Sequence, residues 1–124
     1  MARELFTRIT IVLPLPLSPE HSRATRRILN ELVSFCGGVT FSPPESSFSG
    51  IWEEDSGHHE HAQRMLIIAD APLPIDDPLL NAYLDYTKLR CQREFYEQII
   101  WMTVQSIYRI STYDGERRID PEEA

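Results

Sequence analysis

Few features of this sequence point to secretion, to a membrane or to disulfide chemistry. Only two cysteines occur, Cys36 and Cys91, which is too few for a disulfide framework. The longest apolar stretch, "ITIVLPLPL" at 9–17, contains two prolines and is far shorter than the ~20 residues that span a bilayer. Charged residues precede it and no small-residue cleavage site follows, which argues against a signal peptide. We therefore expect a cytoplasmic protein with no membrane partner.

Basic residues are also scarce. The chain has 12 Lys and Arg against 19 Asp and Glu, which gives a net charge of −7. A duplex nucleic acid needs a basic face, so we expect no nucleic-acid partner. Arg23, Arg26 and Arg27 do lie close together, and we interpret them as a solvated helix face.

The sequence contains no recognisable catalytic motif. The glycines of "CGG" at 36–38 follow a predicted helix, whereas a phosphate-binding loop would open one. The serines near 46–49 have no nucleophile-elbow motif beside them. Whether the chain is an enzyme therefore stays open at this point.

The composition is that of one ordinary globular domain. Hydrophobic residues make up 42% of the 124 positions and charged residues 25%. We assign residues 1–110 to a single domain and the polar residues 111–124 to a C-terminal tail that we expect to fray.

The first half of the chain reads as strand, helix, strand. Residues 7–15 alternate between apolar and polar side chains, which predicts a strand ended by the prolines at 14 and 16. Ser18 and Pro19 are typical of a helix start, and Gly37 and Gly38 of its end. A second strand begins at "VTF", is broken by "SPPESS" and resumes as "FSGIW" up to Trp52.

The second half reads as strand, helix, strand. We expect the polar stretch 53–63 to turn the chain as a loop and 64–70 to form a third strand. Asp77 and Pro78 are suited to capping and opening a second helix. Residues 78–111 would make one unusually long helix, and their texture becomes β-branched and aromatic after Phe95. We therefore predict a helix at 78–96 and a fourth strand at 99–110.

The resulting β-α-β-β-α-β order predicts an α+β, ferredoxin-like two-layer sandwich. Right-handed crossovers give an antiparallel sheet of strand order 4-1-3-2 with both helices on one face. The arrangement "FCGGVTF…W…RMLIIADAP…QREFYEQIIWMTV" also resembles a group of small bacterial ferredoxin-like domains of unknown function. That resemblance implies the fold and supplies no activity.

The uncovered face of such a sheet suggests a partner. On the third strand, Leu66 and Ile68 point to the face opposite Met65 and Ile67. On the fourth, Ile100 and Trp101 point to opposite faces, so both faces carry apolar side chains. Monomers rarely keep a large apolar patch in water. We expect a homodimer joined through the open sheet face, unless the tail or the "SPPESS" segment covers that face.

The four histidines are the main candidates for a metal site. The topology places His21, His58, His59 and His61 at the same end of the molecule. Zinc accepts imidazole ligands, but "HHEH" lacks the i, i+4 spacing that aims two helical rings at one ion. The alternative is a hydrated loop with ordinary titrating histidines, which we favour. We predict no cofactor and keep zinc as the other possibility.

Two classes of function remain. The first is a small, homo-oligomeric module that binds a ligand or another protein, which we prefer. The second is a dimeric ferredoxin-like enzyme of the small oxygenase or isomerase type, with a histidine in an apolar pocket. Trp52, Tyr96 and Trp101 are the candidate pocket residues in either case.

Overall fold

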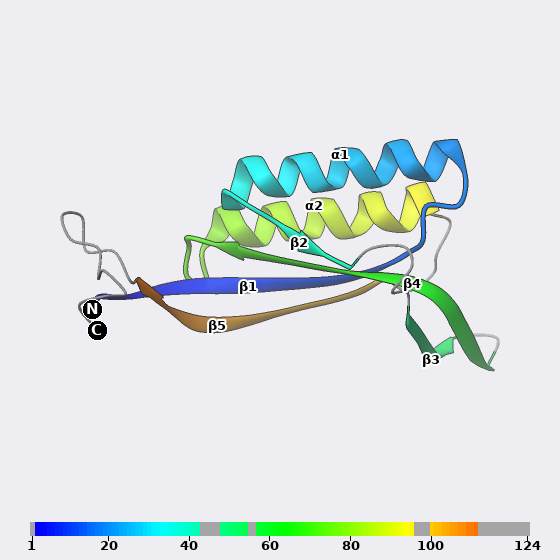
Figure 1. Ribbon diagram of the computed structural model, residues 1–124. Helices are drawn as coiled ribbons and strands as arrows, with labels where there is room; N and C mark the ends of the chain where they lie inside the picture. The colour runs from blue at the N-terminus through cyan, green and yellow to red at the C-terminus, as the bar shows by residue number, and fades with distance from the viewer. Residues whose placement is uncertain (1, 43–47, 55–56, 96–99, 112–124) are drawn as a thin grey trace, which may run out of the picture.

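The alternating apolar residues of the first strand place it inside an antiparallel sheet covered by helices on one side (Figure 1). The computed structural model describes residues 2–42, 48–54, 57–95 and 100–111. Its elements are, in chain order, β1 (Ala2–Pro14), α1 (Pro19–Cys36), β2 (Thr40–Phe41), β3 (Phe48–Glu54), β4 (Gly57–Ala71), α2 (Pro78–Phe95) and β5 (Trp101–Ser111).

The strand order confirms the ferredoxin-like α+β sandwich. The order is β2-β4-β1-β5, with β3 also paired to β4. β2 and β3 are two pieces of the predicted second strand, so the order is 4-1-3-2 as expected. Both helices lie on the same face of the sheet (Figure 1).

The core lies between the helices and one face of the two central strands. Ile9, Ile11 and Leu13 of β1 pair with Ala69, Ile67 and Met65 of β4, and all six are almost fully buried. The helical side chains that cover them are apolar or small (Ala24, Ile28, Leu32, Leu80, Leu84, Cys91 and Phe95). This shared burial supplies the main driving force for the two-layer packing.

Both helices begin at the expected capping residues. Ser18 Oγ accepts a hydrogen bond from the His21 backbone N–H at 3.1 Å, and Asp77 Oδ1 accepts from the Leu79 N–H at 2.8 Å. Helix α1 ends at Gly37, whose φ of 88° is left-handed and whose N–H donates to the Val33 carbonyl.

A chain of four charged side chains joins the exposed sides of the two helices. Arg27 of α1 donates to Glu94 of α2 at 2.9 Å, and Arg90 donates to both carboxylate oxygens of Glu31. Arg90 also reaches Glu94 at 3.5 Å, and its side chain is only 13% exposed. This network links the two helices where they lie side by side above the sheet (Figure 1).

The predicted boundary between the second helix and the last strand is confirmed. Helix α2 ends at Phe95 and β5 starts at Trp101, close to the expected 78–96 and 99–110. β5 continues to Ser111, which pairs with Ala2. The rest of the predicted tail lies outside the described residues.

The predicted bounds of two strands were wrong, because β1 and β4 are both longer than expected. β1 starts at Ala2, because residues 2–6 pair with 107–111 of β5. The expected loop at 53–63 is largely strand: β3 and β4 form a hairpin in which Glu54 pairs with Gly57. Cross-strand pairing between these two segments outweighs the weak strand preference of Asp, Glu and Gly. The hairpin bends away from the helical layer (Figure 1).

Candidate functional site

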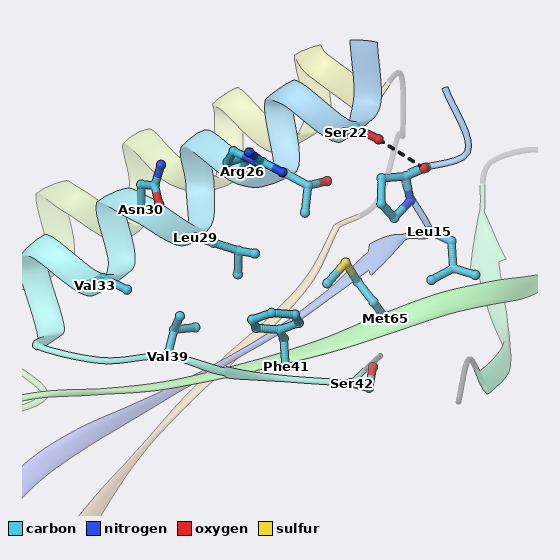
Figure 2. A pocket seen from close by; sticks show the side chains of 12 residues that line it. Leu15, Ser22, Arg26, Leu29, Asn30, Val33, Val39, Phe41, Ser42 and Met65 are labelled. Atoms are coloured by element: carbon cyan, nitrogen blue, oxygen red, sulfur yellow. Dashed lines mark hydrogen bonds between the residues drawn. The ribbon is translucent and has the colours of Figure 1, made fainter. Parts of the chain in front are cut away.

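An apolar cavity lies between α1 and the strands β2 and β4 (Figure 2). Its volume is about 450 Å³, within the usual range for small-molecule sites. Leu29 points into the gap from the helix, while Val39, Phe41 and Met65 point into it from the opposite side (Figure 2). Phe41 remains 49% exposed, so the cavity opens to solvent on the β2 side.

The strand side of the cavity is a short segment that hydrogen bonds attach to β4. β2 contains only two residues, and it holds Phe41 opposite Ile67 of β4. Ser42 continues the attachment: its backbone N–H donates to the Leu66 carbonyl, and its Oγ accepts from the Leu66 N–H, both at 2.9 Å. Among the described residues, this short attached segment forms the β2 side of the cavity.

Polar side chains line the α1 edge of the cavity at four-residue intervals. Ser22, Arg26 and Asn30 share one helix face because i and i+4 residues are neighbours. Ser22 Oγ donates to the Pro16 carbonyl at 3.3 Å (Figure 2). None of the ion pairs among the described residues involves Arg26. Arg26 is also the only charged residue in the described lining.

Thr25 also lines this cavity and carries a buried hydroxyl. The residue is 5% exposed, and its Oγ1 finds no hydrogen-bond partner among the described residues. An unsatisfied buried hydroxyl destabilises a fold by roughly 1–3 kcal/mol. Its position beside the gap is a local weakness of the α1 packing.

A second cavity, mainly polar, lies at the other end of α1. It has a volume of about 470 Å³ and is lined by Arg8, Asp70 and Arg109 together with Cys36 and the two glycines after it. Arg8 donates to both oxygens of Asp70, at 2.9 and 3.1 Å. Burial raises the pKa of the Cys36 thiol to about 11, so the thiol is protonated at neutral pH. The described lining therefore has no free carboxylate and no thiolate nucleophile to offer.

The open face of the sheet alternates apolar and polar cross-strand rows. The register aligns Leu66, Val12 and Trp101 in one row, and Asp70, Arg8 and Gln105 in another. Between these rows Ile68 aligns with Thr10 and Thr103. Trp101 is 47% exposed. The expected apolar side chains are thus on this face, but they share it with an ion pair.

The four predicted histidines come from two elements, the hairpin strand β4 and the first turn of α1, which lie at the same end of the molecule (Figure 1). His58, His59 and His61 lie on β4 of the hairpin, where His59 pairs with Trp52 and His61 with Gly50. Their side chains lie outside the described residues, so the zinc site stays a prediction. His21 lies in the first turn of α1, and its ring contacts the Phe95 ring with centroids 4.9 Å apart. The part of the chain that the structure describes contains no cluster of three metal-ligating side chains.

The three predicted pocket aromatics do not define a described pocket. Trp52 is placed only by its backbone on β3, and Tyr96 lies outside the described residues. Trp101 starts β5 on the open face and lines neither of the two cavities above. The residues that do line the apolar cavity were assigned to the helix face and the strand start. No local pattern marks these residues as a cavity lining, because Leu29 and Val33 have the spacing of ordinary core positions.

Comparisons with solved structures support the fold. No protein-family model matches the chain, and no curated protein matches it. The divalent cation tolerance protein Cut A1 from Thermus thermophilus matches with a TM-score of 0.52 and 14% identity, over 82% of each chain. This match shows a shared fold and nothing finer.

Two further structures match less well. One is CPII, a nitrogen regulatory PII-like protein from Thiomonas intermedia K12 bound to ADP, AMP and bicarbonate. It has a TM-score of 0.46 and 17% identity over 88% of this chain and 99% of that one. The other is CutA1 from Ehrlichia chaffeensis, with a TM-score of 0.48 and 11% identity over 92% of this chain and 89% of that one.

Within the described residues, no helix is long and apolar enough to span a membrane.

Proposed function

We propose that this chain is a small ligand-binding module, with the α1–β2 cavity as its binding site. The observation that carries this proposal is the cavity itself: about 450 Å³ of mostly apolar space that opens to solvent. A concave, apolar site with a few polar groups on one edge is the usual form of a small-molecule site. Phe41 and Leu29 supply opposing apolar walls on which a ligand would be held.

The cavity lining favours binding over catalysis. Among the described residues that line it, the only ionisable side chain is Arg26. General acid–base catalysis needs a group whose pKa lies near the working pH, and a guanidinium stays protonated. Ser22, Ser42 and Thr25 lack a neighbouring base in this described lining, so none is activated as a nucleophile.

A neutral, apolar fluorophore tests the site. We expect N-phenyl-1-naphthylamine to bind saturably with one site per chain, because its aromatic body matches the cavity walls. Leu29→Trp should abolish that binding by filling the gap with an indole. Trp101→Ser, on the opposite face of the sheet, should leave it unchanged. Fluorescence that does not saturate, or that disappears in Trp101→Ser and persists in Leu29→Trp, would contradict the proposal.

We also propose that the module self-associates through its open sheet face. The apolar row Leu66–Val12–Trp101 supports this, because its exposed tryptophan is the kind of residue that anchors interfaces. The Arg8–Asp70 row, which the Ile68–Thr10–Thr103 row separates from it, can set the register between copies, since charged pairs penalise misaligned contacts.

Sedimentation velocity over a range of protein concentrations measures this self-association. We expect a dimer that Trp101→Lys converts to a monomer, because a lysine in a buried apolar row is costly. Leu89→Lys is the matched control: Leu89 is 61% exposed, on the helical layer. A dimer that persists in Trp101→Lys and dissociates in Leu89→Lys would move the interface to the helices.

A further inference from the structure

The α1–β2 cavity combines apolar walls with a single positive charge at its edge. Its described lining contains no Asp or Glu, although the whole chain carries a net charge of −7. Arg26 takes part in no ion pair among the described residues, whereas its neighbour Arg27 pairs with Glu94 at 2.9 Å. The two arginines are therefore not equivalent, although they are adjacent in one basic cluster.

We propose that this cavity binds an elongated apolar molecule with one carboxylate, and that the carboxylate contacts Arg26. This inference rests on the proposed ligand-binding function and names the class of ligand. A guanidinium presents a planar pair of donors that matches a carboxylate in a bidentate geometry. Asn30, one turn further along α1, adds an amide donor on the same edge.

The apolar body of the ligand lies along α1. From Arg26 to Val33 the helix advances about 10 Å, at 1.5 Å per residue. Leu29 and Val33 line this length from the helix, and Phe41 and Met65 face them across the gap (Figure 2). An extended alkyl or aryl chain fits such a groove better than a compact polar molecule does.

The charges of the lining favour an apolar carboxylate over other classes of ligand. A phosphate dianion would need more positive charge or a nest of free backbone N–H groups, and Arg26 is the only cation in the described lining. A cationic ligand would meet a like charge, and the described lining offers it no carboxylate. A neutral ligand would leave the Arg26 guanidinium without a specific partner.

The test uses three probes of equal length: octanoate, octanol and octylammonium. Affinities come from calorimetry, and the site is located by NMR of the methionine ε-methyl groups. Met65 lines the cavity, while Met102 packs against the core from β5. We expect octanoate to bind more tightly than octanol and to shift the Met65 signal and not the Met102 signal. Octylammonium should bind most weakly.

Arg26→Gln and Arg23→Gln form a matched pair of variants. Both remove one positive charge from exposed positions on α1, but only Arg26 lines the cavity. We expect Arg26→Gln to weaken octanoate binding about tenfold and to leave octanol binding unchanged, because a charge-assisted hydrogen bond is lost. Arg23→Gln should change neither affinity by more than about twofold, the residual effect of a screened surface charge.

The outcomes separate this inference from the proposed function. Equal affinities for octanoate and octanol, or an unchanged octanoate affinity in Arg26→Gln, would overturn the carboxylate assignment and keep the cavity as a ligand site. Tighter binding of octylammonium would overturn it as well. No shift of the Met65 signal with any of the three probes would overturn the ligand site itself.

Discussion

The buried thiol of Cys91 makes the stability of this fold sensitive to alkaline pH. Cys91 of α2 is fully buried, and burial raises its pKa from 9.0 to about 12. In the unfolded chain the same thiol ionises near its ordinary value. A folded-state pKa above the unfolded one means that the unfolded state loses its proton first. Stability is therefore unaffected well below pH 9 and falls as the pH rises from about 9 towards 12.

The size of the effect at pH 10 follows from these two values. The pH is then one unit above the pKa of the unfolded thiol, while the folded thiol remains protonated. The free energy of unfolding therefore falls by about 1.4 kcal/mol. At pH 8 the same linkage is below about 0.1 kcal/mol. Tyr83 contributes in the same direction, because burial raises its pKa to about 12.

Urea unfolding at pH 8 and at pH 10, with a phosphine reductant to prevent oxidation, measures the loss. Cys91→Ala lowers stability at both pH values because it opens a small cavity. Its further loss between pH 8 and pH 10 should be smaller than that of the natural sequence by about 1.4 kcal/mol. Tyr83→Phe is the control, since it keeps Cys91 and should retain most of the pH dependence. An equal loss in Cys91→Ala and the natural sequence would refute the reasoning.

Three further predictions concern caps, ion pairs and metal. Asp77→Ala should destabilise the fold by about 1 kcal/mol in urea unfolding, while Asp77→Asn keeps most of the cap. Arg90→Met should cost about 1–2 kcal/mol, between an exposed and a buried ion pair, and a double-mutant cycle with Glu31→Gln should show positive coupling. Calorimetric titration of chelator-stripped protein should find weak zinc binding unchanged by a His59→Ala, His61→Ala double variant; tight stoichiometric binding lost in that variant would establish a zinc site.

The helices were predictable because their ends carry residues with specific backbone roles. Ser18 and Asp77 supply side-chain oxygens for free N–H groups, and Gly37 adopts the left-handed conformation at the end of α1. The division after Phe95 was also readable, because the β-branched and aromatic residues that follow favour a strand. These signals are local, so the sequence alone is enough to locate them.

The hairpin and the cavity were not predictable because both depend on contacts between distant residues. Residues 57–63 become a strand only because β3 pairs with them, and their own composition favours a loop. The cavity depends on where the two-residue β2 joins β4 beneath α1. Leu29 and Val33 read as core positions in either case, and no pattern in α1 indicates that the space beneath them is only partly filled.

The strand β4 connects the two proposed surfaces through the alternation of its side chains. Met65 lines the cavity on the helical side, and Leu66 lies in the apolar row of the open face. Consecutive residues of a strand point to opposite faces, so one apolar segment can serve both surfaces. The helical side of "RMLIIAD" is apolar because Met65, Ile67 and Ala69 belong to the core, and Met65 also borders the cavity. Self-association would account for the apolar residues on the open side. A ligand on the cavity side of β4 leaves the open face free, so binding and self-association need not compete for the same side chains.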